Sequence, residues 1–344
     1  MLVSSMAFSY GLQAKSPNRV KVVVVTMFED GQPQGDFPGE LQYWVERFPL
    51  PEILDFPAGP FPLFSNPRGD VLAICVGGGI ANATASIMAL GFDPRFDLRH
   101  SYWLIAGIAG GDPADTSLGS AVWARHVVDG DLLYEIDARE IPSAWPYGII
   151  PLGGTAPADE PTDIQTGWTL DTIHFALNHK LAGWAYAHSA HLKLKDTPQL
   201  AAFRQQFTQH KAARLPPRVQ MGDTLSSSTY WHGNLLNGWA NDWVALYAGE
   251  QANFVTSNME DSGTLTALER LQRLHKVDMA RVMVLRTVSN YTAPPNGKTA
   301  AWSTTAPYPN EGEPALDSAY VVGAHIINKI LDNWSLYADE VPSL

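Results

Sequence analysis

The hydrophobic positions of this chain fall into short runs that alternate with helical patterns. Runs rich in β-branched residues lie at 21–26, 71–76, 102–106, 121–126 and 281–288. Several are continuously apolar, which is typical of strands covered by helices on both faces. Helical patterns lie between and after them, at 40–47, 81–89, 261–275 and about 317–338. The order of strand, glycine turn and helix predicts an α/β layered domain with a largely parallel sheet.

The pattern favours one domain. The stretch 142–161 is rich in proline and glycine without periodicity and is interpreted as a long surface loop. A domain boundary there is the alternative, but strand and helix patterns resume from Thr169 without a flexible Gly/Ser linker. We expect an N-terminal segment at 1–20, a single domain at 21–338 and a short tail at 339–344.

The N-terminal residues leave the compartment open. Residues 1–14 are mildly apolar and end in Leu12-Gln13-Ala14, which looks like a signal-peptide cleavage site without its basic n-region. An unanchored, frayed terminus would look much the same, so export and cytoplasmic residence stay equally open.

Composition and charge exclude several classes. No apolar run approaches the roughly 20 residues that a membrane-spanning helix needs, so we expect a soluble, non-spanning protein. The net charge of −12 has the wrong sign for binding nucleic acid. The ten histidines show no metal-ligand spacing, and no glycine-flanked serine with triad partners is present. We therefore predict no metal and no cofactor, and we interpret the lone Cys75 as a core residue.

Two glycine runs, at 77–79 and 107–111, follow predicted strands. Asn82 stands where a dinucleotide fingerprint needs glycine, and no lysine follows to make a P-loop. Two such turns could form a floor of backbone N–H groups for a sugar, an anion or a water, with Gly79, Gly107 and Ala109 as candidate contacts. Close packing explains the glycines equally well.

Two polar stretches carry candidate chemistry. In Asn258-Met259-Glu260-Asp261, the first and last residues resemble a capping box, which leaves Glu260 unexplained. A carboxylate there can grip adjacent ribose hydroxyls while Met259 packs on the sugar. Asn290 ends the last predicted strand. It could form an Asx turn there. Alternatively, its carboxamide could meet the N7 edge of a purine and stabilise negative charge on the base.

Aromatic and charged residues add weaker candidates. Tyr230 and Trp231 follow a predicted strand-end turn at 221–224, and either could stack on a base. The stretch 134–140 alternates charged and apolar residues, which favours an exposed strand with cross-strand ion pairs over a site.

Taken in order, these segments resemble the purine nucleoside permease family over nearly the whole chain from about Lys21. The resemblance rests on 26–29, 38–40, 106–111, 134–140, 221–224, 258–261 and 285–290. The domain of that family resembles nucleoside phosphorylases and nucleosidases. The resemblance implies a three-layer nucleoside-phosphorylase-like fold, with a mixed, largely parallel central sheet flanked by helices, a purine nucleoside as ligand and a possible homo-oligomer.

The resemblance also assigns roles. It implies that Met259 and Glu260 hold the ribose, that Asp223 contributes to substrate binding and that Asn290 meets purine N7. Many members that cleave adenine nucleosides have an aspartate at the position of Asn290. A carboxamide there suits 6-oxopurines, or it marks a protein that binds without cleaving.

The choice between water and phosphate as the nucleophile depends on one difference from similar phosphorylases. Similar phosphorylases place an arginine shortly before the 106–111 turn, whereas 102–105 contains no basic residue, so water is favoured over phosphate. Candidate carboxylates to activate that water are Glu29, Asp30, Asp36 and Glu40. We prefer Glu40, because it begins a predicted helix whose dipole would keep it ionised.

The leading hypothesis is therefore hydrolysis of a purine nucleoside, with Asn290 and Glu40 as catalytic residues. Two features depart from the nucleosidase pattern: the loop at 31–39, and Ser120 in place of the usual aspartate. The alternatives are a non-catalytic nucleoside-binding protein that assists uptake and a phosphate-dependent phosphorylase. A structural protein built on the fold ranks below both.

Overall fold

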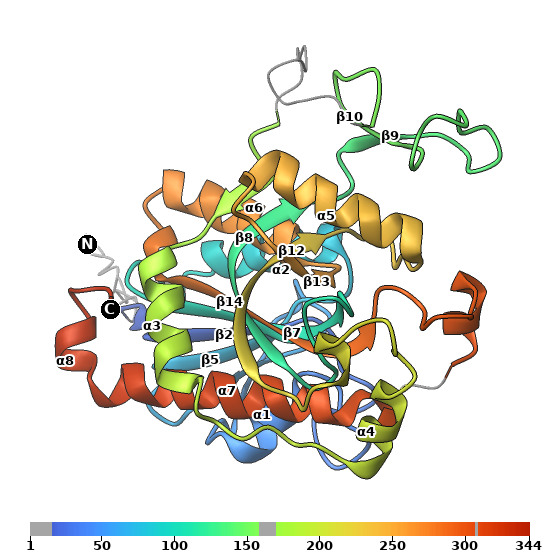
Figure 1. The fold of residues 1–344 in the computed structure, drawn as a ribbon. Helices are drawn as coiled ribbons and strands as arrows, with labels where there is room; N and C mark the ends of the chain where they lie inside the picture. The colour runs from blue at the N-terminus through green and yellow to red at the C-terminus, as the bar shows by residue number, and fades with distance from the viewer. Residues whose placement is uncertain (1–15, 158–169, 307–308) are drawn as a thin grey trace, which may run out of the picture.

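A computed structural model describes residues 16–157, 170–306 and 309–344. The expectation for residues 1–14, and the end of the predicted loop at 158–161, lie outside the described residues. In the described part, a central sheet lies between two layers of helices, as Figure 1 shows. This arrangement confirms the predicted α/β fold class.

The strands are β1 (Asn18–Arg19), β2 (Val22–Thr26), β3 (Glu52–Leu54), β4 (Leu63–Ser65), β5 (Val71–Cys75), β6 (Phe96–Asp97), β7 (Tyr102–Gly111), β8 (Ala121–Asp129), β9 (Leu133–Glu135), β10 (Ile149–Pro151), β11 (His174–Ala176), β12 (Val219–Ser226), β13 (Phe254–Asn258) and β14 (Val282–Tyr291). The α-helices are α1 (Gln42–Arg47), α2 (Ile80–Phe92), α3 (His179–Ser189), α4 (Pro198–Arg204), α5 (Asn234–Ala248), α6 (Asp261–Arg273), α7 (Glu313–Asp332) and α8 (Trp334–Tyr337). Short 3₁₀ segments are η1 (Ala212–Arg214), η2 (Met279–Arg281), η3 (Ala300–Thr304) and η4 (Pro309–Gly312).

The central sheet is mixed. Among the described residues its strand order is β11-β8-β12-β13-β7-β2-β5-β4-β3, and β14 pairs with both β7 and β8. β2 is parallel to β5 and β7, and β14 is parallel to β7. β13 is antiparallel to β7, and β14 is antiparallel to β8. The hairpin of β9 and β10 stands away from this sheet (Figure 1).

Helices bury both faces of the sheet. In β2, Val23 and Val25 belong to the core cluster that contains buried residues of α2 and α6, whereas Val22 and Val24 belong to the cluster with residues of α1, α3 and α7. All four valines are completely buried. Full burial of an aliphatic side chain contributes about 1.5–3 kcal/mol, so a central strand is stable only if it is apolar on both faces. This is why the strand pattern is continuous.

Several predicted boundaries were wrong. The glycines at 107–111 continue β7 and do not form a turn after it, and 221–224 lies inside β12. The predicted loop at 142–161 contains β10. α1 begins at Gln42, two residues after Glu40, and the closing helix divides into α7 and α8 at Asn333.

The hairpin also differs from its prediction. Its strand β9 covers only Leu133–Glu135, and the ion pair nearby joins Asp137 to Arg139 within the loop, not across strands. Among the helices of the described residues, none combines the length and the apolar character needed to cross a bilayer.

Candidate functional site

A cavity of about 210 Å³ lies where the last residues of β2, β7, β13 and β14 come together. Its walls come from segments far apart in the sequence: Met27, Phe28, Glu40, Ile108, Ala109, Gly110, Tyr230, Ser257, Asn258, Met259, Glu260, Ser289 and Asn290. Six of the nine predicted site residues are in this lining: Glu40, Ala109, Tyr230, Met259, Glu260 and Asn290.

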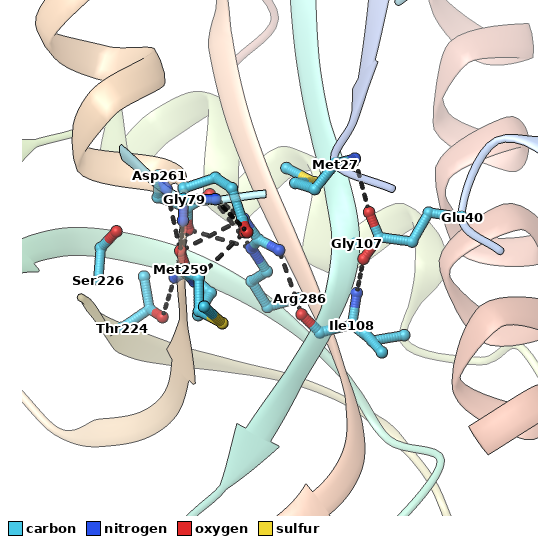
Figure 2. Close-up of polar contacts among 12 residues, drawn as sticks. Met27, Glu40, Gly79, Gly107, Ile108, Thr224, Ser226, Met259, Asp261 and Arg286 are labelled. Carbon is cyan, nitrogen blue, oxygen red and sulfur yellow. Dashed lines mark hydrogen bonds and ion pairs between the residues drawn. The ribbon is translucent and has the colours of Figure 1, made fainter. Parts of the chain in front are cut away.

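Glu40 is held by two backbone amides. Its Oε2 accepts from the N–H of Met27 and its Oε1 from the N–H of Ile108, both at 2.7 Å (Figure 2). Burial raises the pKa of Glu40 to about 8, helped by the nearby Glu260 and opposed by Arg286 and the two amides. Burial thus opposes the expected ionisation of Glu40, and α1 begins only at Gln42, two residues after it.

Glu29 explains how the loop delivers Glu40 to the cavity. The carboxylate of Glu29 accepts hydrogen bonds from the backbone N–H groups of Gly39 and Gln42, the latter at 2.6 Å. It therefore ties the chain just before and just after Glu40. Of the other predicted candidates, Asp30 is exposed and Asp36 accepts from Gln32 N on the exposed loop. None of these three carboxylates is in the cavity lining.

Glu260 approaches the same cavity from the junction of β13 and α6. Its Oε1 accepts from the N–H of Gly79 and its Oε2 from that of Met259, both at 3.2 Å. Burial raises the pKa of Glu260, while Arg286 and these amides lower it. Gly79 is not in the cavity lining; with φ of +88° it opens α2 and positions Glu260 instead of contacting a ligand.

In Figure 2, Arg286 lies between Asp261 and Glu40, and it is paired with Asp261. The side chains of Arg286 and Asp261 are 1% and 0% exposed, and Nε of Arg286 lies 3.1 and 3.2 Å from the two carboxylate oxygens of Asp261. Nη1 of Arg286 also donates to the carbonyl of Ile108 at 3.1 Å. A two-pronged pair of this kind is rigid, and its positive charge faces the glutamates on either side.

Sequence reasoning missed this pair. It treated Asp261 as a helix cap, and Arg286 only as part of a motif. The signal was a charge in the middle of an otherwise apolar strand, because a buried arginine requires a buried partner. Asn258 completes the arrangement: its Oδ1 accepts from the N–H of Asp261 at 2.9 Å and its Nδ2 donates to Oδ2 of Asp261 at 2.7 Å.

Asn290 lies at a β-bulge. The register of β14 against β7 shifts between Val288 and Asn290, which places Asn290 opposite Gly110. Nδ2 of Asn290 donates to the carbonyl of Tyr291 at 3.3 Å, and Oδ1 accepts from the hydroxyl of Ser289 at 2.9 Å. A carbonyl can accept but not donate, so the contact with Tyr291 fixes which end of the amide carries the nitrogen.

Asp223 does not reach the cavity, contrary to the prediction. It is completely buried, pairs with Arg125 at 2.9 Å and accepts from the backbone N–H groups of His126 and Asn253. These contacts tie β12 to β8 and to the start of β13. Because they satisfy its carboxylate inside the sheet, Asp223 has a structural role.

The two aromatic candidates have different surroundings. Tyr230 is exposed and lines the cavity, whereas the ring of Trp231 packs against Trp239 and Phe254. In the described part of the chain, no group of three histidine, cysteine, aspartate or glutamate side chains is placed to hold a metal ion.

Comparisons with known proteins agree with this arrangement of the fold. The family model described as purine nucleoside permease matches residues 19–342. A purine nucleoside permease of Candida albicans is 31% identical over 271 residues, which are 77% of this chain and 64% of that protein. A probable purine nucleoside permease of Schizosaccharomyces pombe is 30% identical over 79% of each chain. The chain thus spans less than two thirds of the Candida relative.

Solved structures share the fold at low identity. Futalosine hydrolase of Helicobacter pylori superposes with a TM-score of 0.53 at 12% identity, over 90% of this chain and 98% of that one. The 5'-methylthioadenosine/S-adenosylhomocysteine nucleosidase of Neisseria meningitidis superposes with a TM-score of 0.51 at 15% identity, over 91% of this chain and 99% of that one. The nucleoside-phosphorylase-like fold is therefore confirmed.

Proposed function

The chain belongs to the purine nucleoside permease family, and on that premise we propose that it binds a purine nucleoside between Glu40 and Asn290 and hydrolyses its N-glycosidic bond. One observation carries the proposal. Glu40, Glu260 and Asn290 line one cavity, although they come from three separate segments of the chain. Two carboxylates and one carboxamide are the groups that this reaction needs.

Glu260 is the group we assign to the ribose. The two amides and Arg286 hold its carboxylate in one orientation, so it can accept from two adjacent sugar hydroxyls without reorganising. Met259 lines the same cavity and offers an apolar surface for the sugar ring. As C1' acquires oxocarbenium character, the negative charge of Glu260 stabilises it.

Asn290 is the group we assign to the base. Its Oδ1 already accepts from Ser289, and one hydrogen of its Nδ2 is given to Tyr291, so the remaining N–H is the donor that it can offer to a ligand. A donor at this position fits N7 and O6 of a 6-oxopurine, which are both acceptors. It stabilises the purine as negative charge develops on it, and solvent then supplies the proton that Asn290 cannot give.

Glu40 is the group we assign to the water. In the hydrolysis, the oxygen of water forms a bond to C1', the C1'–N9 bond breaks, and ionised Glu40 takes the proton of the water. The products are ribose and the free base. General-base assistance of this kind contributes roughly 10²–10⁴-fold to the rate.

Water is favoured over phosphate by the charges of the site. The lining of this cavity, as far as the structure describes it, contains two glutamates and no lysine, arginine or histidine. The nearest buried cation, Arg286, is already paired with Asp261. A phosphate dianion beside two carboxylates would be repelled, which disfavours phosphorolysis.

Binding without cleavage is the second candidate. A pKa of about 8 keeps much of Glu40 protonated at neutral pH, and a protonated carboxyl cannot act as a base. Asn290, for its part, has no proton to transfer. A protein with these properties would retain a nucleoside intact, as one that assists uptake needs to do.

Product analysis separates these functions. The purified chain is incubated with inosine, guanosine or adenosine, with and without phosphate, and the products are separated by chromatography. Free base and ribose without phosphate support hydrolysis, and ribose 1-phosphate formed only with phosphate supports a phosphorylase. Nucleoside that is bound but unchanged after long incubation supports the second candidate.

A further inference from the structure

The dipeptide Asn-Gly occurs twice in the chain, at Asn237-Gly238 and at Asn296-Gly297. The two copies have different surroundings. The first lies inside helix α5, whereas the second lies in the loop between β14 and η3. The same two residue types are therefore held in a helical backbone at one place and in a loop at the other.

The loop copy forms an exposed turn. The N–H of Lys298 donates to the carbonyl of Pro295 at 3.1 Å. This hydrogen bond closes a β-turn whose central residues are Asn296 and Gly297, both exposed. Gly297 has φ of +80°, the value that a type II turn requires at this position, and nothing lies within 4 Å of the place where a Cβ would be.

The side chain of Asn296 is not held in place. Its backbone N–H donates to Oε1 of Gln209 at 3.2 Å. Across the described ranges, however, neither its side-chain amide nor the N–H of Gly297 forms a hydrogen bond. The amide can therefore turn toward the nitrogen of Gly297, and glycine has no side chain that would hinder the approach of that nitrogen.

The helical copy is held on both sides. Nδ2 of Asn237 donates to Oδ2 of Asp112 at 3.1 Å, and Oδ1 of Asn237 accepts from the hydroxyl of Thr292. Gly238 is an interior residue of α5, so its N–H points along the helix axis and away from the side chain of Asn237. Attack by this nitrogen requires local opening of the helix.

We propose that Asn296 is a site of spontaneous modification, at which water converts the asparagine to aspartate or isoaspartate, while Asn237 in the same chain stays intact. The backbone nitrogen of Gly297 forms a bond to Cγ of Asn296, the Cγ–Nδ2 bond breaks, and ammonia leaves with the proton of the attacking nitrogen. Water then opens the five-membered imide at one of its two carbonyl carbons. The net change replaces NH₂ with OH, without oxidation or reduction.

The modification changes the loop in two ways. The new carboxyl group is ionised at neutral pH, so it adds one negative charge to the net charge of −12. In isoaspartate the backbone runs through the former side chain, which lengthens the connection from β14 to η3 by one CH₂ group. The inference does not depend on the proposed nucleoside site.

The test follows both asparagines in the purified full chain during incubation in mildly alkaline buffer. After digestion, the peptides that contain positions 237 and 296 are separated by chromatography. The mass gain from replacing NH₂ with OH is measured for each against a sample digested before incubation. Because Asn237 reacts only when α5 opens, we expect the rate at Asn296 to exceed it by about tenfold or more. Similar rates at the two positions, or no mass gain at position 296, would overturn the inference.

Two controls separate structure from sequence. In guanidinium chloride the unfolded chain exposes both dipeptides, so the two rates should become similar. A tenfold difference that persists there would place the cause in the neighbouring residues and contradict protection by α5. Asn296→Gln lengthens the side chain by one CH₂ group and prevents the five-membered imide, so position 296 should stay unmodified. A mass gain there in this variant would indicate direct hydrolysis of the amide and contradict the imide step.

Discussion

Gly107 and Glu40 are in such close contact that only glycine fits at position 107: an added methyl group would lie 2.5 Å from Oε1 of Glu40 and 2.7 Å from Nη1 of Arg286. Gly107 was predicted to contact a ligand, but it is not in the cavity lining. It instead leaves the space in which Glu40 and Arg286 lie. The position therefore offers a test of how much the site depends on the placement of Glu40.

We expect Gly107→Ala to displace Glu40 and Arg286 and to lower the free energy of unfolding by about 1–3 kcal/mol, as overpacking a tight interior does. The rate of inosine hydrolysis should fall as well. Urea denaturation measures the free energy of unfolding, and the release of hypoxanthine measures the rate. Gly238→Ala in α5 is the control, because nothing lies within 4 Å of the added methyl. Unchanged stability and activity in Gly107→Ala would show that Glu40 does not depend on this contact.

The buried pair of Asp261 and Arg286 should dominate the stability of the site. Asp261→Asn leaves the guanidinium of Arg286 without its carboxylate partner in a fully buried position. Removing one partner of a buried pair costs about 3–5 kcal/mol. Chemical denaturation should show a loss in that range. A loss below about 1 kcal/mol would mean that Glu40 and Glu260 compensate for Asp261.

The rate of hydrolysis should increase with pH. Burial raises the pKa of Glu40 to about 8, and a general base acts only when ionised. Below that pKa, kcat/KM should rise about tenfold per pH unit, and it should level off above it. The profile is measured with inosine from pH 6 to 9.5. An activity that falls over this range would identify Glu40 as a proton donor and contradict its role as a base.

Acid should destabilise the fold through a pair of histidines away from the cavity. Nδ1 of His126 lies 2.9 Å from Nε2 of His174, and His179, Arg125 and Asp223 also face His126. Burial lowers the pKa of both paired rings below 6.5, with Asp223 opposing it. The unfolded chain therefore binds more protons than the folded chain as pH falls through 6.5, so stability decreases there.

Thermal unfolding between pH 7.5 and 5.5 checks this expectation. His174→Asn should reduce the acid-dependent loss of Tm, whereas His100→Gln, at an exposed position, should follow the unmodified chain. Parallel curves for all three proteins would remove the histidine pair from the explanation.

The layers of the fold could be predicted from the sequence, because the patterns that indicate strands and the turns or helices after them are local. The valines of β2 alternate between two buried faces, and each strand is followed by glycine or helix-forming residues. Local signals could not show how far a strand runs through glycines. The glycines of 107–111 were interpreted as a turn, but pairing with β14 and β13 keeps them extended.

The same distinction applies to the site. Met259, Glu260 and Asn290 stand out at strand ends, which made each a candidate, and the family resemblance assigned all three to one purine nucleoside. The pairing of Arg286 with Asp261 and the orientation of Asn290 depend on contacts between distant segments, which no local pattern contains. The structural role of Asp223 could not be predicted for the same reason, since its partner Arg125 lies on another strand.

Glu260→Gln should separate sugar binding from base binding. The amide keeps one acceptor oxygen but places an NH₂ group where the second oxygen accepted, so contacts with the two ribose hydroxyls are weakened. We expect the dissociation constant for inosine to rise about tenfold or more, with that for hypoxanthine nearly unchanged. Calorimetry with both ligands measures the difference. Equal losses for nucleoside and base would count against the assignment of the ribose to Glu260.

Hydrolysis with Glu40 as the base is tested by the release of hypoxanthine from inosine in phosphate-free buffer, measured for three proteins: the unmodified chain, Glu40→Gln and Glu29→Gln. Both glutamates lie on the loop between β2 and α1, are buried and accept from backbone amides, but only Glu40 lines the cavity. We expect hypoxanthine and ribose from the unmodified chain, a rate reduced about 100-fold or more in Glu40→Gln and a rate within a few-fold of the original in Glu29→Gln. No release by the unmodified chain, or equal rates in the two variants, would contradict hydrolysis with Glu40 as the base.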